Sequence, residues 1–97
     1  MSTEYDSSKI RRLAAQVGNV ADSVSKVRST NLRAIQREMP GQFSGEAAKA
    51  LQDAVGDLEA DIYSLSRELL GIRAALLALA NRVDEADRQA KELILRQ

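Results

Sequence analysis

The chain has 97 residues, with 14 basic and 14 acidic side chains, and it has neither cysteine nor histidine. This length allows one domain, and the zero net charge gives no general attraction to nucleic acid or to an anionic membrane. The missing cysteine and histidine exclude thiol nucleophiles, imidazole bases and the usual zinc sites.

The amino-terminal segment lacks the features of a secretory signal peptide. Residues 1–9 are polar, and no apolar core follows them. No run of the chain approaches the roughly 18 apolar residues of a membrane-spanning helix. We therefore expect any export of this chain to use a route other than general secretion.

A first helix is predicted over about residues 7–38. Its interior positions step by three and four residues along one face, at Ile10, Leu13, Val17, Val20, Val24, Val27, Asn31 and Ala34. Asp6, Ser7 or Ser8 can cap its start, and Pro40 followed by Gly41 is expected to end it. Asn31 has two readings: a buried polar residue that fixes register, or a residue that reaches water.

A second helix is predicted over about residues 45–95. Ser44 can cap it, and Glu46 suits the positive end of the helix dipole. Its apolar residues repeat at steps of four and three over six heptads, which is typical of a helix that packs lengthwise against another helix. They are Leu51, Val55, Leu58, Ile62, Leu65, Leu69, Ile72, Leu76, Leu79, Val83, Ala86, Ala90 and Leu93.

Together the two helices predict an all-α fold, with residues 1–97 as a single antiparallel helical hairpin. The turn at 39–44 is short, so the helices must be neighbours. Folding there pairs residue i with roughly residue 84 − i, so that helix one ends opposite about residue 77. Residues 1–40 have a net charge of +3 and residues 41–97 of −3, which suits this pairing.

The second helix also has an apolar flank beside its main stripe. A helix that is apolar on two sides is usually covered on two sides, and small residues allow close approach. We predict that this flank joins two hairpins into a four-helix bundle; the alternative is scattered surface leucines. The predicted interface residues are Tyr63, Leu70, Gly71, Ala74, Leu77 and Ala78.

The end of helix two is expected to outrun helix one. We predict that this tail meets a partner or an export machine, frayed when alone and ordered when docked, because a short isolated helix is marginal. The alternative is a solvated helix end with incidental leucines. The tail residues singled out are Val83, Asp84, Asp87, Leu93, Ile94 and Leu95.

No catalytic, cofactor or metal site is predicted. The carboxylates at 57, 59 and 61, and those at 84, 85 and 87, lie on different sides of a helix and do not converge. Arg11 and Arg12 form a basic pair without aromatic neighbours, which gives no nucleic-acid signature. We therefore expect a protein that is not an enzyme.

The turn motif Phe43-Ser44-Gly45, near the middle of a chain of about a hundred residues, resembles the WXG (Trp-X-Gly) hundred-residue superfamily. These are the small helical hairpins of type VII (ESX) secretion. Gly45 permits a tight entry into helix two, and the ring of Phe43 is expected to plug the end of the bundle. Phe43 replaces the family tryptophan, as in subgroups that accompany LXG toxins, and the family's carboxy-terminal Tyr-X-X-X-Asp/Glu signal is missing.

The resemblance implies a non-enzymatic interaction protein, either a small secreted substrate or a targeting factor for a larger toxin. Implied partners are a second copy, a homologous hairpin or the helical amino-terminal region of an LXG toxin, together with the type VII secretion ATPase. The chain would be cytoplasmic before export and then secreted or at the cell surface, without a cleavable signal peptide. The competing reading is an intracellular coiled-coil adaptor unconnected with secretion.

Overall fold

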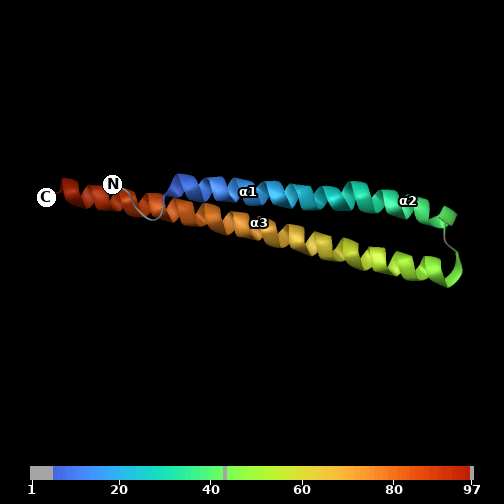
Figure 1. Cartoon of the computed structure of the whole chain (residues 1–97). Helices are drawn as coiled ribbons and strands as arrows, with labels where there is room; N and C mark the ends of the chain where they lie inside the picture. Colours follow the sequence, from blue (N-terminus) through green and yellow to red (C-terminus); the bar gives the residue numbers. More distant parts are fainter. Residues whose placement is uncertain (1–5, 43, 97) are drawn as a thin grey trace.

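The computed structural model describes residues 6–42 and 44–96. Its elements are the helix α1 (Ser7–Lys26), the π-helix η1 (Val27–Leu32), α2 (Arg33–Gln42) and α3 (Gly45–Leu95). Figure 1 shows α1, η1 and α2 as one continuous rod lying antiparallel to α3, and the two rods diverge toward the turn. The predicted all-α hairpin is confirmed. Its extents are 79 × 16 × 15 Å, and α3 sets the long dimension.

The first rod begins at a capped helix end. The Asp6 carboxylate accepts hydrogen bonds from the Ser8 backbone N–H at 2.9 Å and from the Ser8 hydroxyl at 2.7 Å. These two bonds lower the pKa of Asp6, because they stabilise its ionised form. Of the three candidate caps, Asp6 is the one that caps the helix, and α1 begins at Ser7.

The first rod contains a π-helical segment that the sequence pattern did not reveal. Ser29, Thr30 and Asn31 are weak helix formers, and a π-helix inserts extra chain into a helical path. The insertion turns Leu32 toward α3, where it is buried, and leaves Asn31 exposed. Of the two readings for Asn31, the one in which it reaches water holds.

The first rod also ends later than predicted. The sequence placed its end at about residue 38, but the helix continues to Gln42. Proline lacks one N–H and so removes only one backbone bond, which the last turn of a helix tolerates better than its interior. Ser44 then occupies the N-cap position of α3 in extended conformation, without a side-chain capping bond.

Gly45 adopts a left-handed conformation, with φ of +65°. We expect Gly45→Ala to lower the free energy of unfolding by about 1–2 kcal/mol, because a Cβ clashes with the backbone in that region. Gly56 is the matched control, because it lies in α3 with open space where a Cβ would be. Gly56→Ala should raise stability by about 0.5–1 kcal/mol. Urea unfolding measures both; equal effects of the two changes would contradict the strained entry.

The two rods pair further along α3 than predicted. The hydroxyls of Ser25 and Ser66 lie 3.0 Å apart, and Gly18 faces the Arg73 side chain, so residue i pairs with about residue 91 − i. The predicted register of roughly 84 − i is wrong, because the first rod runs to Gln42 and the turn is shorter than expected. Coverage of α3 extends to Asp84, which is 2.7 Å from Arg11.

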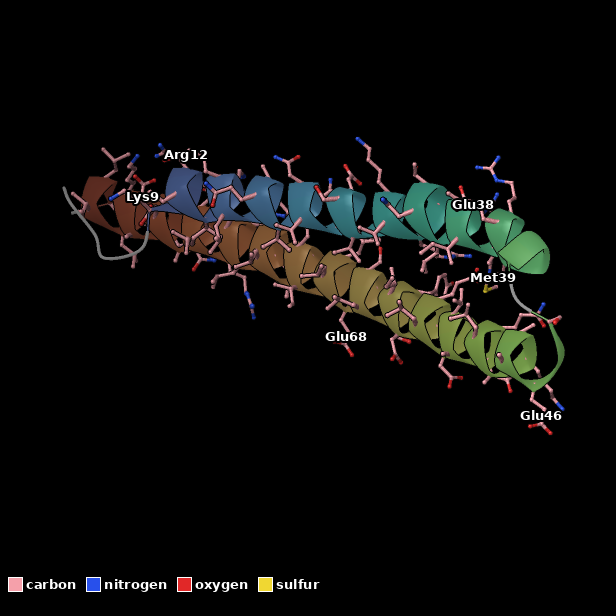
Figure 2. The ribbon with its side chains drawn as sticks, turned by 45° about the vertical axis from the view of Figure 1, so that its right-hand side comes forward. Lys9, Arg12, Glu38, Met39, Glu46 and Glu68 are labelled. Atoms are coloured by element: carbon pink, nitrogen blue, oxygen red, sulfur yellow. The ribbon has the colours of Figure 1, made fainter. Side chains whose placement is uncertain are left out.

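The interior between the rods is thin. Near the turn, Leu32, Met39 and Val55 form a small buried cluster, and Figure 2 shows Met39 between the two rods. Toward the other end, the most buried residues are small: Ala14, Ala21 and Ala80. Among the described residues, no large side chain is less than 2% exposed. The hairpin therefore leaves most of its large apolar side chains in contact with solvent.

Candidate functional site: the uncovered faces of the hairpin

The long apolar stripe of α3 divides between the interior and the surface. About half of its members face the first rod and are buried or half-buried: Leu51, Val55, Ile62, Leu69, Leu76 and Val83. The members between them are exposed: Leu58, Leu65, Ile72 and Leu79. Contact with the first rod is completed instead by Ser66 and Ala80, which lie on the other flank of α3. The stripe thus serves two surfaces.

The apolar stripe of the first rod divides in the same way. Ile10, Val17 and Val24 are half-buried, whereas Leu13, Val20 and Val27 are 44–51% exposed. The centre of the contact consists of small residues one heptad or half a heptad apart: Ala14, Gly18, Ala21 and Ser25. This spacing of small residues is the signal that could have placed the contact from sequence, because small residues let helices approach closely.

The exposed rows of the two helices lie on one side of the hairpin. Arg11, Gly18 and Ser25 lie on the side of α1 that meets Asp84 and Ser66, opposite to its exposed row. On α3, Ser66 and Asp84 likewise lie on the opposite side from its exposed row. Both rows therefore form one surface, the broad apolar face, consisting of Leu13, Val20, Val27, Leu58, Leu65, Ile72 and Leu79, which are 38–51% exposed.

The interface predicted from the sequence lies on the opposite side. Tyr63, Leu70 and Leu77 are 47%, 44% and 36% exposed, and Gly71, Ala74 and Ala78 are also exposed. Tyr63 and Leu70 line a hollow of about 310 Å³ with Arg28 and Arg67. The guanidinium carbons of these two arginines lie 5.2 and 5.9 Å from the centre of the Tyr63 ring. Of the predicted residues, Tyr63 and Leu70 thus line a groove that also contains arginines.

The turn motif is described in part. Phe43 lies outside the described residues, so its expected role as a plug stays a prediction. Ser44 is extended and Gly45 left-handed, which is the tight entry into α3 that glycine permits. The motif therefore sets the point at which the chain reverses.

The predicted tail residues separate into two groups. Val83 is half-buried, and the hydroxyl of Ser7 and the guanidinium of Arg11 lower the pKa of Asp84. These two residues belong to the hairpin. The overhang, residues 85–95, extends beyond α1. Asp87 is exposed there, and the exposed fractions of its last three apolar residues are 61%, 70% and 84%: Leu93, Ile94 and Leu95.

The overhang is helical, where fraying was predicted. Arg88 forms ion pairs with Glu85 and Glu92, one turn away on either side, and lowers the pKa of Glu85. Such pairs at three- and four-residue spacing support a helix that has no packing partner. The overhang is thus a preformed extension of α3.

Within residues 6–42 and 44–96, no group of three or more acidic side chains is placed to hold a metal ion. In the same described part, no helix is both long and apolar enough to cross a membrane. What the surface offers is helix faces, and the chemistry that it supports is association.

The comparisons with known proteins agree with this arrangement. A family model described as "Proteins of 100 residues with WXG" matches residues 2–88. No curated protein and no solved structure matches the chain. Proteins of the matched family are small helical hairpins that form homodimers and heterodimers and are associated with type VII secretion. Because the match spans most of the sequence, the chain belongs to the WXG100 family.

Proposed function

We propose that this chain is a non-enzymatic interaction protein of a type VII secretion system, which pairs with another helical hairpin through its broad apolar face. The other hairpin is a second copy, a homologous chain or the helical amino-terminal region of an LXG-type toxin. The observation that carries the proposal is the broad apolar face itself. A row of large apolar side chains on each helix, on one side of the molecule, is what a four-helix bundle covers.

The energetics support pairing. Full burial of a leucine, isoleucine or valine contributes about 1.5–3 kcal/mol, and the seven residues of the broad apolar face are only about half covered by the hairpin. The side chains inside the hairpin are mostly small or only half-buried, so they contribute less than full burial would. Covering the broad apolar face therefore adds several kcal/mol to a chain whose own core is thin.

We further propose that the overhang contacts the secretion ATPase or the cognate partner. It is preformed, it projects past α1, and it ends in three consecutive exposed apolar residues, Leu93, Ile94 and Leu95. A preformed helix loses less conformational entropy on docking than a disordered segment does. The overhang is also the region in which the resembled family carries its export signal, although the tyrosine of that signal is missing from this chain.

Ending the chain after Glu85 should leave the hairpin folded, because coverage by α1 ends at Asp84. We expect the midpoint of urea unfolding and the dimer mass of the truncated chain to match those of the full chain. Loss of the dimer on truncation would show that the overhang holds the pair together.

The secretion role is tested by export. Three proteins are expressed in a host with a type VII locus and in the same host without its secretion ATPase. They are the full chain, the chain ending after Glu85, and the double variant Leu65→Glu with Ile72→Glu. We expect ATPase-dependent export of the full chain, with the truncated dimer and the face variant retained in the cell. Retention of the full chain, whether or not the ATPase is present, would favour the intracellular adaptor instead.

A further inference from the structure

The groove opposite the broad apolar face carries a concentration of arginines. Three adjoining hollows, of about 310, 340 and 710 Å³, share Arg28 or Glu59 in their linings. Between them they are lined by four arginines and one carboxylate. We call this surface the arginine groove: Arg28, Arg33, Arg37 and Arg67, with Glu59, Tyr63 and Leu70.

The single carboxylate does not neutralise the arginine groove. One oxygen of Glu59 lies 3.4 Å from Arg28 and the other lies 3.4 Å from Gln36. In the described part of the chain, neither Arg33 nor Arg37 forms an ion pair. The arginine groove therefore presents guanidinium groups with donor capacity to spare.

The π-helix η1 brings these cations together. A π-helix closes its hydrogen bonds over five residues instead of four, so that residues five apart lie closer to the same side than they do in an α-helix. Arg28 and Arg33 are five apart across this segment, and both line hollows that contain Glu59. Arg37 follows Arg33 by one turn of α2. An uninterrupted α-helix would place Arg28 and Arg33 on different sides.

An apolar row that begins in the arginine groove continues along α3 at helical spacing. Tyr63, Leu70 and Leu77 are one heptad apart and exposed, which places them about 10.5 Å apart along α3. Arg28 and Arg67 lie over the Tyr63 ring, so that cations flank the apolar row. A helix laid along this row meets apolar contacts at its own heptad repeat and guanidinium groups beside them.

We propose that the arginine groove binds an acidic amphipathic helix of a different chain, with apolar residues one heptad apart and carboxylates beside them. The acidic overhang of a second copy is a poor fit, because Glu85 and Glu92 are already paired with Arg88. This binding goes beyond the pairing of hairpins, because it uses the other side of the molecule. A pair joined through the broad apolar face leaves both arginine grooves open.

A designed peptide tests the proposal with the full chain. The probe is a four-heptad helix with leucine at positions a and d and glutamate at e and g; its matched version has lysine at e and g. Like charges suppress the pairing of each peptide with itself. The variants are Arg33→Glu with Arg37→Glu, and as control Arg12→Glu with Lys26→Glu, which removes two exposed cations of α1 elsewhere.

We expect the glutamate peptide to bind, the lysine peptide to bind at least tenfold more weakly, and added salt to weaken binding. Arg33→Glu with Arg37→Glu should weaken glutamate-peptide binding about tenfold, with the dimer mass unchanged, and the control variant should bind normally. The proposal would be overturned if the two peptides bound with equal affinity, or if the control variant lost as much glutamate-peptide binding as Arg33→Glu with Arg37→Glu. Loss of peptide binding only in Leu65→Glu with Ile72→Glu would overturn it as well. Binding of a single-stranded oligonucleotide in place of the peptide would also overturn it.

Discussion

Replacing Leu65 and Ile72 by glutamate should abolish association, with a dissociation constant raised at least a hundredfold. Both side chains lie at the middle of the broad apolar face and are 45% and 50% exposed in the hairpin. Once a second hairpin covers them, each introduced carboxylate is desolvated without a partner, at a cost of several kcal/mol. Light scattering across a dilution series gives the mass, and circular dichroism gives the helix content.

The matched control makes the same chemical change on the opposite side. Leu70→Glu with Leu77→Glu also replaces two leucines one heptad apart, with similar exposure of 44% and 36%. We expect this variant to keep the dimer, because these residues lie on the side of the arginine groove, away from the broad apolar face. If it dissociates and Leu65→Glu with Ile72→Glu does not, pairing uses the interface that the sequence pattern predicted, and the broad apolar face is not the pairing surface.

Ala80→Leu should destabilise the hairpin by about 1–3 kcal/mol, because Ala80 is fully buried where the rods pack through small residues. The added atoms must separate α1 from α3 or adopt a strained rotamer. For a chain of this size, each kcal/mol of lost stability lowers the melting temperature by about 4–8 °C.

Ala78→Leu is the control for this change, because Ala78 lies two residues away on the same helix and is exposed. It should shift the melting temperature by no more than a degree or two. Equal shifts in the two variants would show that the rods do not pack closely at Ala80, and that the small-residue contact assigned here is wrong.

Much of the fold could be predicted from the periodicity of the sequence. The apolar stripe of α3 predicted a long packed helix, and Pro40 with Gly41 marked the end of the first rod to within a few residues. The register was missed because it depends on where the turn lies and on the π-helical insertion near Ser29 and Asn31. Neither feature changes the spacing of the apolar residues, which still alternates between three and four.

The uncovered faces were only partly predictable, for a different physical reason. An apolar stripe with a 3.5-residue period is wide enough to contact two neighbouring helices. The sequence alone does not say which half of the stripe faces the first rod of the same hairpin. The sequence pattern put Leu58 and Leu65 in the same stripe as the interior residues, yet Ser66 and Ala80 complete the contact of α3 instead and leave those leucines exposed. The arginine groove was missed because Arg28 and Arg33 come together only through the π-helix.

The mass of the folded protein decides whether two hairpins pair. Size-exclusion chromatography with light scattering, at micromolar concentration, reports the mass of the species that is helical by circular dichroism. The pairing account predicts that the helical species has twice the 10.6 kDa of one chain, or carries another hairpin bound to it. A stable and fully helical species of 10.6 kDa would contradict it, because the broad apolar face would then need no cover.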